Sequence, residues 1–253
     1  MTAKKKKKLI RRLFELTGWT VSKLKPEAYD QDKLYTFHNH DFMTDPAFVR
    51  AYQRGVLAAD DDYHWHWRVH VGRWAASGAA KLAGNFVECG VNRGFLASAI
   101  MEHLQRDGLG KTFYLMDPFS GIDARFITAE ERAGGILERN RSEFYTTSLD
   151  TVQKNFAEWE KVQIIAGAIP ETLAAVTAER IAYLHLDMNC TPPEVAAFEH
   201  FWHRLVPGAF VLLNDCAYKG FEPQKIAMDG AARAVDVQIM SLPTGQGLMI
   251  KPC

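Results

Sequence analysis

The sequence predicts an α/β protein in which a mostly parallel β-sheet is covered by helices on both faces. Short apolar runs rich in β-branched and aromatic residues alternate with longer segments of helical periodicity, which is the pattern of parallel strands joined by helices. The run Phe86–Leu96 has the form of a strand that breaks at a glycine and opens a helix. A chain of 253 residues is also long enough to bury one large α/β core.

Five strands and their helices are expected in order along the chain. The strands are expected at 85–90, 112–117, 162–166, 181–187 and 209–214, and the helices at 94–107, 148–160 and 192–206. The last helix is bounded by Pro192-Pro193 and by Pro207-Gly208, because proline favours a helix start and Pro-Gly ends one. Residues 235–242 and 248–251 flank a turn and predict a C-terminal antiparallel hairpin. These seven strands predict the Rossmann-like sheet of a class I methyltransferase.

Composition places the chain among globular proteins. Hydrophobic residues make up 47% and charged residues 24%, and no apolar run approaches the roughly 20 residues of a membrane span. We expect no secretory signal, because the basic start is not followed by an apolar stretch and a small-residue cleavage site. The four cysteines, at 89, 190, 216 and 253, have no C-x-x-C spacing. A reduced, cytoplasmic protein is therefore expected.

The net charge of zero conceals a basic N-terminal arm. Nine Lys and Arg residues against Glu15 give residues 1–25 a charge of +8, which leaves −8 on the remainder. Apolar residues between Leu9 and Leu16 recur beside these charges at helical spacing, as in an amphipathic helix that lies on an anionic membrane. A solvated tail, or a helix packed on its own domain, is the alternative. Nucleic-acid binding is not expected, because the basic residues stop at the arm.

The glycine turn indicates the kind of ligand. A dinucleotide fingerprint reads G-x-G-x-x-G, whereas this turn reads Glu88-x-Gly90-x-x-x-Gly94, with an acid before the first glycine. A carboxylate there repels phosphate but suits S-adenosylmethionine, which carries a sulfonium and an ammonium. A purely structural turn and an NAD-dependent oxidoreductase are the alternatives, and the acid and the wider glycine spacing argue against the second.

Other expected cofactor contacts follow the second and third strands. Asp117 ends the second strand 23 residues after Gly94, a position from which a carboxylate accepts hydrogen bonds from ribose hydroxyls. Phe119 and Ile169 are expected to wall the adenine, although either could belong to the core. Asn92 in the turn and Gly167 after the third strand complete the expected cofactor site.

Polar residues at the ends of the fourth and fifth strands predict a metal site. Asp187 follows the fourth strand, and Asn214 and Asp215 follow the fifth. Adjacent strand ends would bring these oxygen ligands together in a set suited to Mg²⁺, which could hold an acceptor oxygen in line with a methyl group. The alternative is that these residues only end strands in a wet cleft.

Several spaced blocks resemble one family. They are Phe86–Gly94, Asp117–Gly121, Gly167–Leu173, Asp187–Asn189 and Leu205–Asp215. In this order, over about residues 85–220, they resemble the macrocin-type (TylF-like) O-methyltransferases. The resemblance implies an enzyme that depends on S-adenosylmethionine and Mg²⁺ and methylates a hydroxyl of a sugar or glycosylated metabolite. It also suggests a homo-oligomer.

Two departures from the family pattern bear on catalysis. Family members usually have Asp-Gly-Asp-Leu-Tyr after the fourth strand, with the second Asp resembling the general base, and Asp-Asp after the fifth. This chain has Asn189 and Asn214 at those places. Because an amide does not take up a proton at neutral pH, either another group is the base or the protein is a binding module that has lost catalysis. His185, on the same strand face as Asp187, is one candidate base, and the other substitutes are His64, His66, His70, Tyr218 and Lys219.

The expected organisation is an extension and one catalytic domain. Residues 1–84 would form the basic arm and a helical extension, and residues 85–253 the methyltransferase domain. The segments 26–84 and 121–147 do not fit the strand-helix alternation, so both are candidate lids over the carboxyl edge of the sheet.

Overall fold

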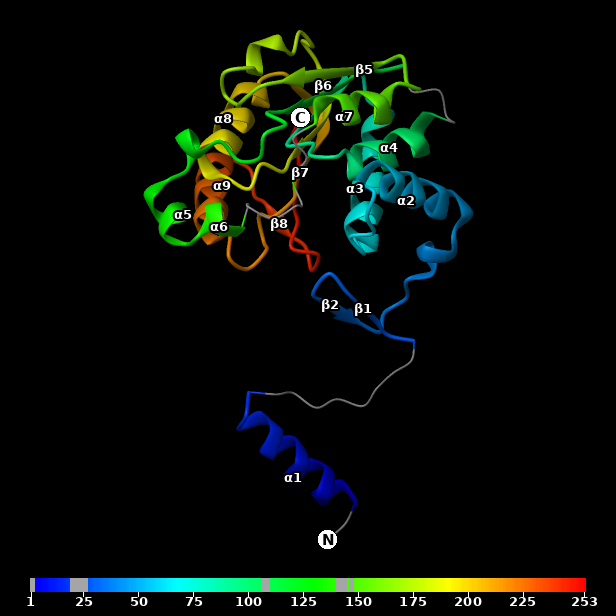
Figure 1. Ribbon diagram of the computed structural model, residues 1–253, viewed down its shortest axis with the longest axis vertical. Coiled ribbons are helices and arrows are strands. Elements are labelled where there is room, and N and C mark those ends of the chain that lie inside the picture. The colour runs from blue at the N-terminus through cyan, green and yellow to red at the C-terminus, as the bar shows by residue number, and fades with distance from the viewer. Residues whose placement is uncertain (1–2, 19–26, 106–109, 140–144, 146–147) are drawn as a thin grey trace. The chain divides into compact units, whose positions relative to one another are not determined.

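The computed structural model describes residues 3–18, 27–105, 110–139, 145 and 148–253. These residues belong to two units, residues 1–40 and 41–253. The first unit contains helix α1, Ala3–Glu15, and a hairpin of strands β1, Tyr29–Gln31, and β2, Leu34–Thr36 (Figure 1). The two residues of the hairpin turn both have positive φ, as a tight two-residue turn requires. In the described part of the chain, no helix has both the length and the apolar run needed to cross a membrane.

The second unit is built on a seven-stranded sheet with the order β5-β4-β3-β6-β7-β9-β8. The strands are β3 Asn85–Cys89, β4 Phe113–Asp117, β5 Val162–Ala166, β6 Ile181–Leu186, β7 Leu205–Leu213, β8 Met240–Ser241 and β9 Gly247–Ile250. Strands β3 to β7 pair in parallel, and β9 pairs antiparallel with β7 and with β8. The predicted fold class, a mostly parallel sheet closed by a C-terminal antiparallel pair, is therefore confirmed.

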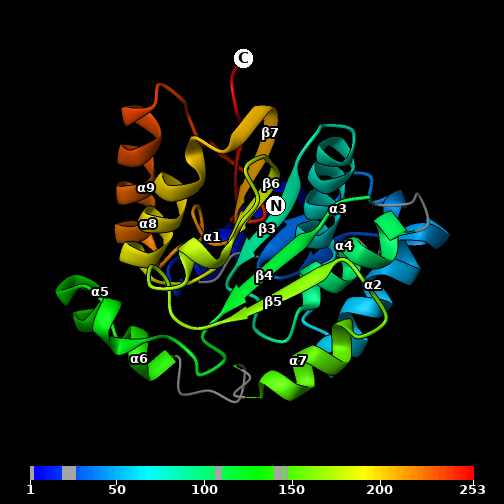
Figure 2. The same cartoon turned by 90° about the horizontal axis from the view of Figure 1, so that it is seen from above.

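Helices cover both faces of this sheet (Figure 2). On one side lie α2, Pro46–Ala59, α3, His66–Ala80, and α4, Phe95–Gln105; on the other lie α8, Thr191–Trp202, and α9, Glu222–Ala234. Helix α7, Leu149–Phe156, packs beside β5, and two short helices, α5 Ala129–Ala133 and α6 Ile136–Arg139, lie in the insertion after β4. Short 3₁₀ turns cover Asp41–Thr44, Ala124–Phe126 and Leu173–Ala175.

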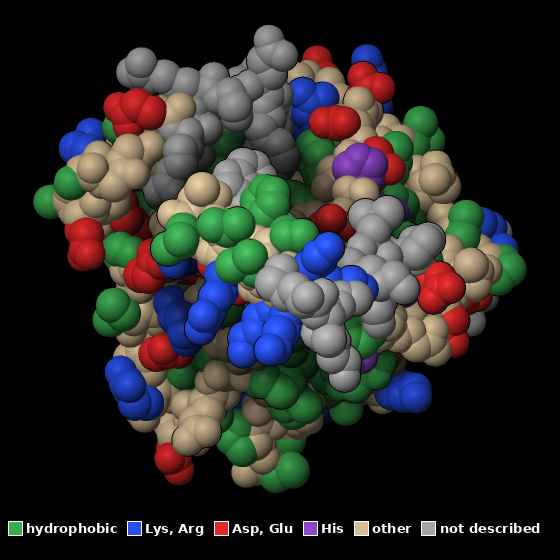
Figure 3. Space-filling model, turned by 90° about the horizontal axis from the view of Figure 1, so that it is seen from below, with side chains coloured by type: hydrophobic (Ala, Val, Ile, Leu, Met, Phe, Trp, Pro, Cys, Tyr) green, Lys and Arg blue, Asp and Glu red, His purple; other side chains and the backbone are tan. Residues whose placement is uncertain are grey.

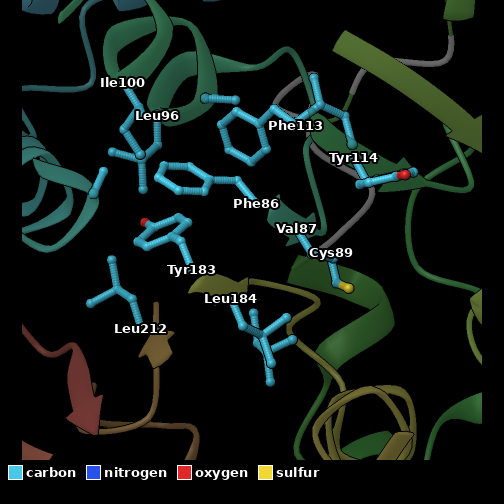
Figure 4. Packing of buried hydrophobic residues seen from close by; sticks show 14 of the residues in the cluster. Phe86, Val87, Cys89, Leu96, Ile100, Phe113, Tyr114, Tyr183, Leu184 and Leu212 are labelled. Carbon is cyan, nitrogen blue, oxygen red and sulfur yellow. The ribbon is translucent and has the colours of Figure 1, made fainter. Parts of the chain in front are cut away.

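Aromatic side chains on neighbouring strands form the centre of the core. Phe86 of β3 is in register with Phe113 of β4 and with Tyr183 of β6. Its ring lies 5.7 Å from that of Phe113 and 5.2 Å from that of Tyr183, in edge and tilted arrangements that favour aromatic pairs (Figure 4). All three side chains are fully buried. The central strands read as continuous apolar runs because both of their faces are covered.

The predicted boundary between the last crossover helix and its strand is wrong. Helix α8 ends at Trp202, and β7 already begins at Leu205, so Pro207 and Gly208 lie inside the strand. The pairing of β6 with β7 shifts register between Ile181 and Tyr183, and Gly208 has a φ of +82°. Pro207-Gly208 therefore forms an irregularity within the strand, where a missing N–H and a positive φ are tolerated.

The C-terminal hairpin is shorter than expected. Only Met240–Ser241 of the predicted strand 235–242 pairs with β9. The preceding residues follow helix α9, which was not among the helices expected from the sequence, and Val237 N donates to Ala232 O in the turn that ends this helix. The alanine-rich run before Val235 favours a helix, and this leaves few residues for the strand.

Candidate active site

The turn after β3 brings the chain against the end of β6. Gly90 has a φ of +90°, and a Cβ atom there would lie 1.9 Å from the backbone oxygen of Asp187, so no side chain fits. Gly94 has a φ of +86°, and a Cβ there would meet the Phe156 ring at 2.5 Å. The two glycines therefore permit two different close approaches, one to β6 and one to α7.

Asp117, at the end of β4, holds this turn through its carboxylate. Its Oδ2 accepts hydrogen bonds from the backbone nitrogens of Val91 and Asn92, each at 2.8 Å, and its Oδ1 accepts one from Phe119 N at 2.6 Å. Burial raises the pKa of Asp117, although the three backbone donors act in the opposite direction. A carboxylate has about four lone-pair positions, so the three backbone bonds leave one for a ligand.

A cavity lies at the carboxyl ends of β3, β4 and β6, which is where open α/β sheets bind their ligands. Of the residues predicted from the sequence, Gly90, Asn92, Asp117, Ile169 and Asp187 line it. Lining residues that the sequence did not mark as site residues include Pro118, Ile122, Phe126, Tyr145, Met188 and Cys190. Since Ile122, Phe126 and Tyr145 come from the segment 121–147, this insertion contributes to the wall.

Four residues predicted to bind the cofactor are not part of the cavity wall. They are Glu88, Gly94, Phe119 and Gly167. Phe119 is buried with a φ of +49°. Gly167 has a φ of +141°, and a Cβ atom there would lie 2.5 Å from the Thr172 methyl group. Both residues are thus placed to shape the loops behind the wall.

Glu88 faces His185 inside the sheet. The two residues are in register on β3 and β6, both are almost completely buried, and Glu88 Oε2 lies 3.3 Å from His185 Nδ1. Burial lowers the pKa of His185, but the facing Glu88 outweighs burial and the pKa is raised overall. Neither residue lines the cavity. The acid of the glycine motif and the candidate base His185 therefore contact each other.

Asp187, which is partly exposed to the cavity, and the buried Asp215 form an acidic pair at the ends of β6 and β7. Burial and the nearby Asp215 carboxylate raise the pKa of Asp187 to about 8. Asp215 Oδ1 accepts a hydrogen bond at 3.1 Å from Arg68 Nη1, and the same nitrogen donates to Asn214 O at 3.2 Å. Arg68 comes from α3, is only 4% exposed, and lies 4.9 Å over the Tyr218 ring. An arginine thus supplies positive charge where the sequence predicted a metal ion.

The predicted metal ligands provide two carboxylates and one amide. Within the described residues, no group of three or more His, Cys, Asp or Glu side chains is arranged to hold a metal ion. Asp187, Asn214 and Asp215 are oxygen donors of the kind that Mg²⁺ prefers, but Asp215 Oδ1 already accepts a hydrogen bond from Arg68, so the guanidinium group competes with a metal ion for this carboxylate.

Asn189 contacts the insertion that lines the cavity. It has a φ of +55°, and its Nδ2 donates to the Tyr145 hydroxyl at 3.1 Å. Burial is the main cause that raises the pKa of Tyr145, so this hydroxyl stays protonated at neutral pH. Tyr145 was not predicted as a site residue, and nothing in a single sequence marks one tyrosine of a polar insertion.

The substitute bases named from the sequence lie elsewhere in the fold. His66 stacks on Tyr52 with ring centres 4.4 Å apart, and His70 stacks on Phe42 at 4.0 Å. His64 Nδ1 lies 3.6 Å from an Asp62 carboxylate oxygen, and Lys219 is exposed. None of these residues, nor Tyr218, is part of the cavity wall.

Two further buried acids hold the loops around the cavity. Glu194 of α8 is 1% exposed, its Oε1 accepts from Met188 N at 3.1 Å, and burial raises its pKa to about 7. Glu131 of α5 accepts from Thr191 N at 2.6 Å. It therefore connects the insertion to the start of α8.

Comparison with known proteins gives the family. A family model described as macrocin O-methyltransferase (TylF) matches residues 75–238. The chain is 28% identical over 147 residues to mycinamicin III 3''-O-methyltransferase of Micromonospora griseorubida. The aligned region covers 53% of this chain and 56% of that protein. It is 26% identical, over 149 residues and 54% of each protein, to 8-demethyl-8-(2,3-dimethoxy-alpha-L-rhamnosyl)-tetracenomycin-C 4'-O-methyltransferase of Streptomyces olivaceus. The chain thus spans about half the length of these relatives.

Solved structures agree with the fold. The O-methyltransferase NovP superposes with a TM-score of 0.66 at 20% identity, over 74% of this chain and 80% of that one. The calicheamicin methyltransferase CalS11 superposes with a TM-score of 0.60 at 14% identity, over 85% and 98%. At these identities the likeness shows the fold alone. Since the family model covers more than half of the chain, the protein belongs to the macrocin O-methyltransferase family.

Proposed function

We propose that this protein is an S-adenosylmethionine-dependent O-methyltransferase that methylates a hydroxyl group of a sugar or glycosylated metabolite. The observation that carries the proposal is one cavity whose wall includes the glycine turn, Asp117 and Asp187. A cofactor subsite and a proton acceptor within one enclosure are what methyl transfer to a hydroxyl requires. Membership of the family supports the same chemistry.

The backbone at Gly90 and the polar groups of the cavity wall support binding of the cofactor. At Gly90, where a Cβ would clash with β6, only the bare backbone borders the cavity, and Asp117 keeps one lone-pair position for a ribose hydroxyl. Asn92 and Ile169 would complete the binding surface. When bound, S-adenosylmethionine supplies an electrophilic methyl group on a positively charged sulfur. Glu88, Gly94, Phe119 and Gly167 would act on the cofactor indirectly, by shaping the loops that hold it.

We assign the role of general base to Asp187. Its carboxyl group lines the cavity, and a raised pKa suits a group that takes up the proton released by an acceptor hydroxyl. Asn189 would position Tyr145 in the wall through their hydrogen bond. His185 would act only through Glu88 and the strands, because it does not reach the cavity.

The proposed mechanism includes no magnesium ion. Arg68 already neutralises Asp215, which weakens the donor set at Asp187, Asn214 and Asp215. We therefore derive no step through a metal ion, and the positive charge of Arg68 would stabilise the acidic pair in its place.

The acceptor class is inferred from relatives. The names of the two relatives describe transfer to mycinamicin III and to a rhamnosyl tetracenomycin. We extend only the shared part, a hydroxyl on a sugar-bearing metabolite, to this chain. A cytoplasmic location, a homo-oligomeric state and a methyltransferase domain beginning at residue 85 stay predictions.

The test combines cofactor binding with turnover. Calorimetry should detect binding of S-adenosylmethionine and of its demethylated product, and mass spectrometry should detect methylation within a panel of rhamnosides and other glycosides. Asp187→Asn should lower turnover about 10²- to 10⁴-fold while cofactor binding is kept. Asp150→Asn, at an exposed position on α7, is the matched control and should change neither.

Two results would count against the proposal. Absence of cofactor binding would remove the proposed function altogether. Cofactor binding without turnover on any glycoside would favour the binding module, an alternative that gains less support because Asp187 keeps its place in the cavity.

A further inference from the structure

We propose that α1 docks the protein on a membrane surface rich in anionic lipid. This helix has a basic side and an apolar side, and every described side chain from Lys5 to Leu16 is exposed. The inference is independent of the proposed function, because it concerns the first unit of the chain and its test measures lipid binding.

The apolar side of α1 is wide and well defined. Leu9, Ile10, Leu13 and Phe14 follow the i, i+1, i+4, i+5 spacing that places side chains on one helix face. Each of the four is 46–56% exposed, and Leu16 just beyond the helix is 84% exposed. Large apolar side chains grouped in this way indicate a surface that a partner covers.

The positive charge of α1 indicates a negatively charged partner. Seven Lys and Arg residues lie between positions 4 and 12, and Glu15 is the single acid of the helix, so its net charge is +6. Glu15 is paired with Arg11 at 3.0 Å, one turn away. Blue Lys and Arg side chains lie beside green hydrophobic ones in the view of Figure 3. A surface that is negative at its headgroups and apolar beneath them matches both sides of α1 at once.

The length of α1 determines how it would lie. Its 13 residues extend about 20 Å, whereas a span of the hydrocarbon core takes roughly 20 residues. The helix would therefore lie in the plane of the interface, with Leu13 and Phe14 buried and the basic residues at the headgroups. Lys6, which falls on the apolar side near the start, can extend its ammonium group back to the headgroups. A helix of this length is marginal in water, and burial of its apolar side would stabilise it.

The test is sedimentation of the full chain with lipid vesicles. Vesicles of phosphatidylcholine with about 30 mol% of the anionic lipid phosphatidylglycerol should bind the protein. Vesicles of phosphatidylcholine alone should bind it far more weakly. Binding should also weaken when the salt is raised from about 0.1 to about 1 M, because the Debye length falls from about 10 to about 3 Å.

Paired variants separate the two sides of the helix. Lys8→Gln with Arg12→Gln should lower the partitioning of the protein onto anionic vesicles roughly 30-fold, which is about fivefold for each charge removed. Leu13→Ser with Phe14→Ser should lower it at least about tenfold, because two apolar side chains no longer enter the interface. The matched controls are Arg50→Gln with Lys81→Gln, and Leu57→Ser with Ile226→Ser, which change exposed residues outside α1 and should have no effect.

Three outcomes would overturn the inference. The first is an absence of binding to anionic vesicles, and the second is binding that the α1 variants leave unchanged. The third combines two results: the unmodified chain does not bind vesicles, and the variant Leu13→Ser with Phe14→Ser changes its oligomeric state in sedimentation velocity. That result would mean that a second copy of the protein covers the apolar side instead.

Discussion

Replacement of Arg68 by methionine should strongly destabilise the protein. Arg68 is 4% exposed, and its Nη1 lies 3.1 Å from Asp215 Oδ1 and 3.2 Å from Asn214 O. Methionine keeps much of the apolar stem but removes the charge, which leaves the buried carboxylate of Asp215 without its counter-charge. Loss of one partner of a buried ion pair typically costs about 3–5 kcal/mol.

The expected loss can be measured by chemical and thermal unfolding. For a protein of this size, 1 kcal/mol corresponds to about 2–4 °C, so Arg68→Met should lower the melting temperature by about 6–20 °C. Lys225→Met is the matched control. Its ammonium group is 2.8 Å from Asp229, but both side chains are about one-third exposed, and pairs of that kind contribute only about 0–1 kcal/mol.

A double variant separates charge from packing. Asp215→Asn in the Arg68→Met background removes the uncompensated carboxylate, so it should recover most of the lost stability even though no ion pair is restored. The reasoning is refuted if Arg68→Met costs no more than Lys225→Met. It is also refuted if Asp215→Asn lowers stability further in the double variant.

Two other residues and the metal question give further tests around the same site. Burial raises the pKa of Glu194 to about 7 from an unfolded value near 4.5, so the folded state binds a proton more tightly than the unfolded state does. The stability that this proton contributes is therefore complete below pH 4.5 and is lost as the pH rises through 7. In unfolding measurements at pH 5 and pH 8, Glu194→Gln should reduce the loss of unfolding free energy between the two pH values by up to about 3 kcal/mol. Glu199→Gln, at an exposed position on the same helix, should leave that loss unchanged. Gly90→Ala should cost more than about 3 kcal/mol or prevent folding, and Gly230→Ala, where a Cβ meets nothing within 4 Å, should be neutral or stabilising; equal effects would contradict the clash with β6. Chelation by EDTA should leave turnover within about twofold, and a larger loss that Mg²⁺ reverses would show that a metal ion acts here despite Arg68.

Strand positions could be predicted because they depend on local pattern. The central strands β3 to β6 were expected within one or two residues of their ends, since buried parallel strands read as apolar runs ended by glycine or an acid. The start of β7 was misplaced because Pro-Gly usually ends a helix, and only the pairing with β6 reveals that it lies inside a strand. Turn chemistry alone does not contain that information.

Arg68 shows why the candidate site could be predicted only in part. Its helix buries Val69, Gly72, Ala76 and Ala79, and Arg68 lies one turn before Gly72 on that same side. Arg68 was not among the residues singled out from the sequence, because its partner Asp215 is 147 residues away and no local pattern connects the two. The oxygen ligands at the strand ends predicted a metal ion, whereas the described residues place the guanidinium group of Arg68 against Asp215, and Arg68 comes from a helix in a different part of the chain.

The position of the insertion after β4 depends on contacts of the same long-range kind. Thr128 and Glu131 form a capping box at the start of α5, a signal that is visible in the sequence. Glu131 also accepts a hydrogen bond from Thr191 N, 60 residues further on, at the start of α8. One carboxylate thus caps two helices and fixes the insertion beside Cys190 in the cavity wall. The part of the cavity wall that the insertion forms is therefore held by the folded framework, and if the proposed function holds, we expect a change of acceptor specificity from Ile122, Phe126 and Tyr145 rather than from the glycine turn.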